Sequence, residues 1–143
     1  MKKIQHFLTE AKQKLITVSP DDRVYFALTR LADNNLSSVL VLDSGKLVGI
    51  FSERDYARKV ALQGKNSQTS TVKEVMTSNL VTMRPDQSIA ECMQIMTERH
   101  IRHLPIVDSD EKLVGIVSIG DVVKETMEEQ RRMIEELQRY IAG

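Results

Sequence analysis

An internal repeat constrains the fold of this chain more than any other feature, because residues 16 to 59 are matched in order by residues 81 to 125. The first stretch of identities is Thr17, Pro20, Asp21, Asp43 and Ser44, which recur as Thr82, Pro85, Asp86, Asp108 and Ser109. After a one-residue insertion, Lys46, Leu47, Val48, Gly49, Ile50, Ser52 and Asp55 recur as Lys112, Leu113, Val114, Gly115, Ile116, Ser118 and Asp121. Each copy is too small to bury an adequate core alone, so the two copies should pack face to face. Any groove between them would then occur twice.

Each copy is predicted to form a β-α-β-β-α unit. The expected strands are Leu15 to Val18, Val39 to Leu42 and Lys46 to Phe51 in the first copy, and Leu80 to Met83, Leu104 to Val107 and Lys112 to Val117 in the second. Apolar residues at helical spacing follow each Pro-Asp pair and predict the intervening helices. The expected fold class is therefore α/β (α+β), with two pseudo-symmetric repeats packed through their sheets. We place the first repeat with its connector at residues 1–70 and the second at residues 71–143.

The composition restricts the classes of partner. Twenty basic and twenty acidic side chains balance to a formal net charge of +0, so no global field attracts nucleic acid or an anionic membrane. Residues 1 to 15 contain only short apolar pieces interrupted by lysines, unlike a secretory signal or a membrane span. The single Cys92 cannot form an intrachain disulfide and suits a reducing compartment. A soluble, cytoplasmic protein is expected.

The strongest local motif is Ser-x-x-Asp, which occurs as Ser52 and Asp55 and again as Ser118 and Asp121 where a strand becomes a helix. Two interpretations are open. In the first, the serine and the aspartate only cap the helix. In the second, the carboxylate accepts hydrogen bonds from both hydroxyls of a ribose, while the serine and the free N–H groups of the helix start bind a phosphate. A glycine three residues before each serine allows another group to approach the strand closely.

The two copies differ at the positions that would line a groove. Pro105 lies inside an expected strand and removes a hydrogen-bond donor there, which favours an edge or a wall for a flat ring. The first copy has Leu40 in its place, and Gly120 stands where the first copy has Arg54. The two grooves should therefore differ chemically.

The last helix continues far beyond its counterpart in the first copy. Its apolar residues form one narrow stripe of Val123, Met127, Ile134, Leu137 and Ile141. This stripe could cover the body of its own chain, or it could form a homodimer contact. The second alternative is favoured, because the stripe extends past the repeat that would have to cover it.

Taken together, these motifs resemble the tandem cystathionine-β-synthase (CBS) domain pair, also called a Bateman module, over nearly the whole chain. The resemblance rests on Thr-x-x-Pro-Asp, the strand Arg102-His103-Leu104-Pro105-Ile106-Val107, Lys-Leu-Val-Gly-Ile and Ser-x-x-Asp. It is closest to the small stand-alone type and implies two clefts that bind AMP, ADP, ATP, NAD or S-adenosylmethionine. It also implies assembly into dimers.

The resemblance assigns roles to particular residues. Asp55 and Asp121 match the ribose-binding aspartate, and Ser52 and Ser118 match the hydroxyl beside ribose or phosphate. The residues that would line the adenine pockets are Thr17, Thr82, His103 and Pro105. In the first copy Ser38 and Leu40 replace His103 and Pro105, so that pocket departs from the family pattern. The candidate phosphate-neutralising residues are Lys12, Arg54, Arg99 and Arg102, each of which could instead be a solvated surface charge.

Two rival functions are weighed against this one. An enzyme is disfavoured because His100 and His103 lack companions for a metal site and Cys92 lacks an adjacent base. A ligand-free scaffold is the other rival, with the serines and aspartates serving only as helix caps. The preferred hypothesis is a non-catalytic sensor of adenine nucleotides that signals through a homodimer or an effector protein, with no metal, nucleic acid or membrane involved.

Overall fold

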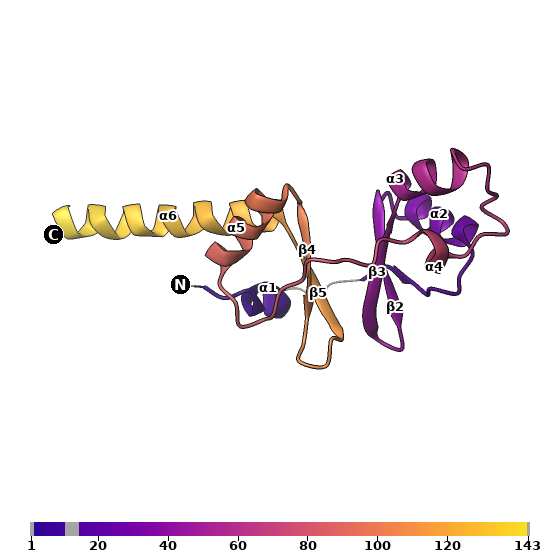
Figure 1. Ribbon diagram of the computed structural model, residues 1–143. Helices are drawn as coiled ribbons and strands as arrows, with labels where there is room; N and C mark the ends of the chain where they lie inside the picture. Colours follow the sequence, from indigo (N-terminus) through magenta and orange to yellow (C-terminus); the bar gives the residue numbers. More distant parts are fainter. Residues whose placement is uncertain (1, 11–14, 143) are drawn as a thin grey trace. The chain divides into compact units, whose positions relative to one another are not determined.

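The computed structural model describes residues 2–10 and 15–142. The elements are, in chain order, α1 (Gln5–Glu10), β1 (Thr17–Val18), α2 (Val24–Asp33), β2 (Ser38–Asp43), β3 (Lys46–Ser52), α3 (Glu53–Tyr56), the π-helical turn η1 (Ala57–Ala61), α4 (Val72–Val75), α5 (Ile89–Arg99), β4 (His103–Val107), β5 (Leu113–Ser118) and α6 (Ile119–Ala142) (Figure 1). This mixture of small sheets and helices confirms the predicted fold class. No helix in the described ranges is long and apolar enough to cross a lipid bilayer.

The chain forms two compact units. Within the described ranges, one unit consists of residues 15–82 together with Val107–Val114. The other consists of the described parts of Met1–Gln13 and Gly115–Gly143 together with Met83–Ile106.

The first repeat contains a three-stranded sheet in the order β1-β2-β3. β1 runs parallel to β2, with Thr17 opposite Leu40, and β2 runs antiparallel to β3, with Ser38 opposite Ser52. The hairpin between β2 and β3 turns at Ser44 and Gly45, whose φ angles of 53° and 83° suit a tight two-residue turn between twisted strands. The pairing brings Ser38 beside the point where β3 ends and α3 begins.

The core of this unit lies between the sheet and α2. Val24, Ala27 and Leu31 on α2 are buried, which confirms the predicted inward face of this helix. They belong to one cluster with Val39, Val41 and Phe51 of the sheet and with Val60, Val72 and Val75. Burying a side chain such as that of Phe51 contributes about 1.5–3 kcal/mol. The cluster therefore fixes the β3–α3 junction, which carries Ser52.

The second repeat contains a two-stranded sheet of β4 and β5. The strand expected at residues 80–83 is reduced to one parallel bridge between Met83 and Ile106, in which the Met83 N–H donates to the Pro105 carbonyl oxygen at 3.0 Å. Pro105 explains the difference. It has no N–H to donate, so the pair that corresponds to Thr17 and Leu40 cannot form.

Two short helices dock onto their units through matching hydrogen bonds. At the start of α4, the N–H groups of Val72 and Lys73 donate to the carbonyl oxygens of Asp22 and Pro20, both at 2.9 Å. Before and in α1, the N–H groups of Ile4 and Gln5 donate to the equivalent oxygens of Gln87 and Pro85 at 2.8 and 2.9 Å. Each repeat is thus completed by the segment that precedes the other repeat in the chain.

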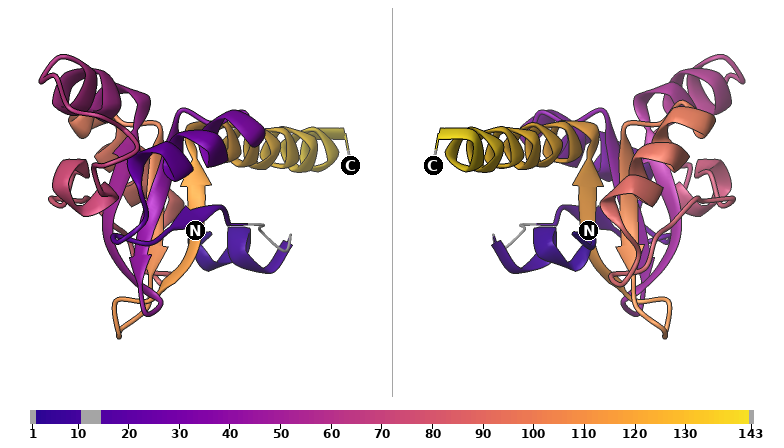
Figure 2. Two further views of the ribbon diagram at one scale, coloured as in Figure 1. Left: turned by 90° about the vertical axis from the view of Figure 1, so that its right-hand side faces the viewer. Right: turned by 90° about the vertical axis from the view of Figure 1, so that its left-hand side faces the viewer.

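α6 is one uninterrupted helix of 24 residues, which confirms the predicted extension (Figure 2). Its first turns bury Val122 and Glu125. The Glu125 carboxylate contacts Lys2 Nζ, His6 Nε2 at 3.4 Å and an Arg132 guanidinium nitrogen at 3.1 Å. The hydrogen bond from Lys2 is the main cause that holds the pKa of Glu125 below its usual value. Every residue from 130 to 142 is exposed.

Candidate functional site

The Ser-x-x-Asp motif of the first repeat forms a capping box at the start of α3. The Ser52 N–H donates to Asp55 Oδ2 at 3.0 Å, and the Asp55 N–H donates to Ser52 Oγ at 3.1 Å. The Ser52 hydroxyl also donates to Asp55 Oδ2 at 3.0 Å. The capping interpretation is therefore correct for this junction, and it occupies one carboxylate oxygen.

The second oxygen of Asp55 is occupied too. Asp55 Oδ1 accepts a hydrogen bond from Thr77 Oγ1 at 3.2 Å and lies 3.1 Å from Lys59 Nζ. The residue is only 8% exposed. Lys59 and Thr77 were not among the predicted site residues. Lys59 could have been found from its position four residues after Asp55 on a helix, whereas nothing local in the sequence indicates Thr77.

The group that approaches Gly49 of β3 closely is another segment of the same chain, residues 76 and 77. Ile50 exchanges two backbone hydrogen bonds with Thr77, at 2.9 and 2.8 Å. A Cβ atom added at Gly49 would lie 2.6 Å from Met76 Sδ and 3.1 Å from the Thr77 carbonyl oxygen. Gly49 thus makes room for residues 76 and 77, and the Thr77 hydroxyl then reaches Asp55.

The matching motif of the second repeat has the same cap and fewer neighbours. The Ser118 N–H donates to Asp121 Oδ2 at 3.1 Å, and the Asp121 N–H donates to Ser118 Oγ at 3.1 Å. Asp121 is exposed. Within residues 2–10 and 15–142, no side chain donates to its Oδ1 and no cation pairs with it. Asp121 therefore offers a charged acceptor to solvent at the start of a long helix.

Two other predicted residues of the second repeat adjoin this helix start. The Ile119 N–H donates to the Arg102 carbonyl oxygen at 2.8 Å, so the entry to β4 lies beside the first turn of α6. Arg102 and His103 are exposed there, whereas Pro105 is buried inside β4. Thr82 directly precedes Met83, whose N–H is bonded to Pro105.

The first repeat places its predicted residues in an equivalent pattern with different chemistry. The Glu53 N–H donates to the Ser37 carbonyl oxygen at 3.0 Å, as Ile119 does to Arg102. Ser38 is partly buried opposite Ser52, and Arg54 is exposed on α3. Thr17 pairs with the buried Leu40 on the sheet. Lys12 lies outside the described residues.

The remaining candidates from the sequence are Cys92, Arg99 and His100. There, no three His, Cys, Asp or Glu side chains are grouped closely enough to hold a metal ion. Burial raises the pKa of the Cys92 thiol to about 11, which disfavours the nucleophilic thiolate. Arg99 and His100 are exposed at the end of α5, where His100 adopts a left-handed conformation with φ of 55°.

Two proteins are similar to this chain in sequence. The chain is 38% identical over 128 residues to the mitochondrial CBS domain-containing protein CBSX3 of Arabidopsis thaliana, a match that covers 86% of this chain and 62% of that protein. It is 37% identical over 114 residues to the CBS domain-containing protein YhcV of Bacillus subtilis, with 80% of each chain covered.

Solved structures of CBS-pair proteins also match this chain. The complex of CBSX2 with AMP superposes with a TM-score of 0.75 at 29% identity, covering 90% of this chain and 98% of that one. The CBS domain pair of protein MJ0100 with 5-methylthioadenosine and S-adenosyl-L-methionine has a TM-score of 0.72 at 26% identity, covering 90% and 98%. The family model of the CBS domain matches residues 8–62 and again residues 72–128. The internal repeat is thus a pair of CBS domains, and the chain belongs to the CBS domain family.

Proposed function

We propose that this CBS pair is a non-catalytic regulatory module that binds an adenine nucleotide, and that the second repeat provides the principal site. The observation that carries the proposal is the exposed carboxylate of Asp121, which has one oxygen engaged in the helix cap and one open to solvent. A carboxylate in this position can accept hydrogen bonds from the vicinal hydroxyls of a ribose.

The surroundings of Asp121 suit the rest of a nucleotide. The N–H groups of Ile119 and Asp121 are already bonded to the Arg102 carbonyl oxygen and to Ser118 Oγ, so a phosphate is proposed to bind through the Ser118 hydroxyl, with the helix dipole favouring an anion at this end. Arg102 is exposed and its carbonyl oxygen is bonded to the same turn, so its side chain is proposed to supply a balancing charge. Thr82, His103 and the rigid Pro105 are proposed to bound the base.

The first repeat is proposed to bind more weakly. Both oxygens of Asp55 already have donors within the protein, and Lys59 neutralises its charge. A ribose would have to displace Thr77 or Lys59 before it could bind this carboxylate. Thr17, Ser38, Ser52 and Arg54 stay candidates for this weaker site, with Arg54 as the phosphate partner.

The relatives support the class of ligand. CBSX2 was crystallised with AMP, and the MJ0100 pair with 5-methylthioadenosine and S-adenosyl-L-methionine. Adenosine is the part that these ligands share. AMP, ADP, ATP, NAD and S-adenosylmethionine all present the same diol, so the proposal extends to each of them.

Calorimetric titration tests the proposal. The full chain is titrated with each of these five compounds, with GMP as a control for the base and 2′-deoxy-AMP as a control for the diol. At least one adenine compound should bind. If a carboxylate accepts hydrogen bonds from the ribose diol of AMP, 2′-deoxy-AMP should bind about tenfold more weakly than AMP. No heat of binding at millimolar concentration would contradict the sensor, and product formed from any bound nucleotide would contradict the non-catalytic assignment.

One observation favours a second candidate function. Both Ser-x-x-Asp motifs form helix caps, and in a ligand-free interaction scaffold capping would be their whole role. The titration decides between the two functions, because a scaffold needs no nucleotide. Under the sensor hypothesis, occupancy is reported through a second copy or an effector protein, provided that the ligand binds one state of the assembly more tightly than another.

A further inference from the structure

The two repeats carry opposite charges at the position four residues after the motif aspartate. The first repeat has Lys59 four residues after Asp55, and the second has Glu125 four residues after Asp121. Residues with this spacing are neighbours on the surface of a helix. The position therefore decides whether the aspartate meets a cation or a second anion.

Lys59 is held in place by two acceptors. Its Nζ lies 3.1 Å from Asp55 Oδ1 and donates to the Val75 carbonyl oxygen at 3.0 Å. Val75 is the last residue of α4, where carbonyl oxygens lack a partner within their own helix. The Lys59 side chain is 43% exposed and that of Asp55 only 11%, so the lysine is the more accessible partner. A ligand that approaches Asp55 from solvent therefore has to compete with the ammonium group.

Glu125 cannot play the same part in the second repeat. It carries the same charge as Asp121, so it cannot serve as a counter-ion. Its own carboxylate is buried and contacts Lys2, His6 and Arg132. The residue that closes the carboxylate in the first repeat is thus replaced in the second by one that is committed to the packing of α6.

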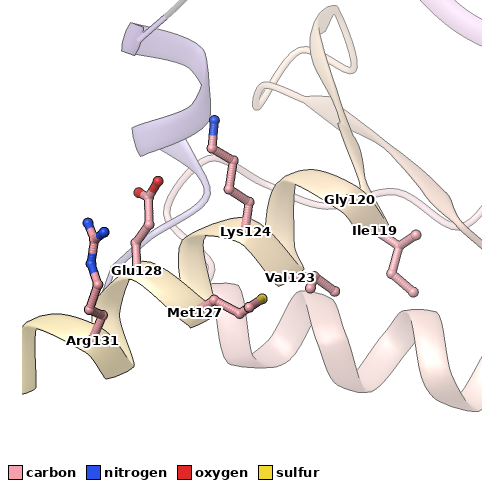
Figure 3. A pocket seen from close by; sticks show the side chains of 7 residues that line it. All are labelled: Ile119, Gly120, Val123, Lys124, Met127, Glu128 and Arg131. Atoms are coloured by element: carbon pink, nitrogen blue, oxygen red, sulfur yellow. The ribbon is translucent and has the colours of Figure 1, made fainter. Parts of the chain in front are cut away.

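No other described cation takes the place of Lys59 beside Asp121. The cation nearest to Asp121 in the sequence is Lys124, which lines an open depression of about 720 Å³ with Ile119 and Val123 (Figure 3). A spacing of three residues on a helix would permit an ion pair between Lys124 and Asp121. Within residues 2–10 and 15–142 that ion pair is not formed. The charge of Asp121 is therefore left for a ligand, whereas that of Asp55 is neutralised.

We propose that Lys59 is an internal counter-ion that closes the site of the first repeat, so that each chain binds one adenine nucleotide tightly and a second far more weakly. The inference rests on the proposed function and identifies the residue that regulates it. A ribose can bind Asp55 only when the ammonium group leaves, and the departing ammonium also loses its hydrogen bond to Val75. Opening of the first site therefore removes a contact that holds the end of α4.

Calorimetric titration with AMP in an Asp121→Asn background tests the proposal, because this background weakens the second site and leaves the first to be measured. Adding Lys59→Met removes the ammonium group and should strengthen binding at the first site about tenfold, since the ribose no longer has to break charged hydrogen bonds. Lys59→Gln keeps a neutral donor and should give a smaller gain. Lys59→Arg keeps a cation and should leave the site closed.

Two controls show whether the gain comes from the freed carboxylate. Arg58→Met removes an exposed cation from the same turn and should change the affinity for AMP by less than about twofold. Adding Asp55→Asn to Lys59→Met should abolish the gain, because the charged acceptor is lost. The proposal is overturned if neither Lys59→Met nor Lys59→Gln strengthens binding, if Arg58→Met gives an equal gain, or if the gain persists without the Asp55 carboxylate.

The number of sites in the parent and in the single Lys59→Met variant separates this inference from the proposed function. One tight site in the parent and two in the variant support both. One tight site in each contradicts the inference alone, as do two sites of similar affinity in the parent. A parent without binding and a variant with one site would sustain the inference but contradict Asp121 as the principal anchor. The absence of binding in both proteins would overturn both.

Discussion

At the scale of single residues, Asp55 and Asp121 show how one motif acquires different chemistry from its neighbours. Each caps a helix through the same pair of hydrogen bonds. Asp55 is then enclosed by Thr77 and Lys59, whereas Asp121 stays exposed. Among the described residues no donor contacts Oδ1 of Asp121, which is therefore the oxygen proposed to bind a ligand, whereas the corresponding oxygen of Asp55 contacts Thr77 and Lys59.

Substitution of each aspartate by asparagine should separate these roles. Asp121→Asn keeps an acceptor for the cap but removes the charge, so the affinity for AMP should fall by about 1–3 kcal/mol, which corresponds to a factor of about 5 to 150. Asp55→Asn should leave most of the affinity but lower the free energy of unfolding by about 1–2 kcal/mol, because Lys59 and Thr77 lose a charged partner. Calorimetry and urea denaturation measure the two effects. Equal affinity in Asp121→Asn and the parent would remove Asp121 from the site.

Glu125 predicts a pH dependence of stability. Its folded pKa lies below the ordinary value of 4.5, mainly because Lys2 donates to it, with His6 and Arg132 as further neighbours. A lowered folded pKa means that its contribution is fully present above about pH 4.5 and is lost as the pH falls through the lowered value. Glu125→Gln should therefore be less stable than the parent by about 1 kcal/mol at pH 7, and the difference should shrink under acid conditions.

Urea denaturation between pH 7 and pH 3 measures this dependence. Glu128→Gln is the matched control, since it removes one carboxylate from the next turn of the same helix and should change the free energy of unfolding by no more than about 0.5 kcal/mol. A Glu125→Gln deficit that stays constant down to pH 3 would contradict the assigned electrostatic role.

At the scale of elements, the strand-to-helix junction of the first repeat depends on Gly49. Gly49→Ala would bring its Cβ within 2.6 Å of Met76 Sδ and 3.1 Å of the Thr77 carbonyl oxygen. The side chain of Met76 can move, but the Thr77 backbone is held by two hydrogen bonds to Ile50. The free energy of unfolding should fall by about 1–3 kcal/mol, as measured by urea denaturation.

Gly120→Ala is the control for this substitution. The nearest atom to its added Cβ is Ser118 Oγ at 3.7 Å, an ordinary contact. Because alanine is a better helix former than glycine, the variant should be unchanged or more stable by up to about 1 kcal/mol. Similar losses at positions 49 and 120 would show that the close approach of Met76 and Thr77 to β3 is not what requires glycine at position 49.

The elements that the sequence predicts well are those with local causes. The caps at Ser52 and Ser118, the inward face of α2 and the length of α6 follow from turn chemistry and periodicity. The loss of a strand at residues 80–83 could have been inferred from the missing N–H of Pro105. The neighbours of Asp55 could not, since Thr77 reaches it through a tertiary contact 22 residues away.

At the scale of the whole molecule, the least predictable feature is the exchange of segments between repeats. Ile4 and the start of α1 precede the first repeat but bond to Gln87 and Pro85 of the second, and α4 precedes the second repeat but bonds to Asp22 and Pro20 of the first. These hydrogen bonds join backbone atoms, so no particular side chain in the sequence indicates them. The consequence is that neither repeat is complete when the chain is cut between them.

This exchange predicts which half of the molecule responds to a core substitution. Ile4 and Val72 are both fully buried, so Ile4→Ala should lower the free energy of unfolding by about 2–4 kcal/mol and Val72→Ala by somewhat less. Hydrogen exchange measured by mass spectrometry should show the loss of protection in α5 and β5 for Ile4→Ala, because α1 is bonded to that unit, and in β2 and β3 for Val72→Ala. The two variants thus serve as each other's control. Faster exchange in β2 and β3 of Ile4→Ala, with α5 and β5 still protected, would show that α1 stabilises the repeat that it precedes in sequence, and the exchanged arrangement would be wrong.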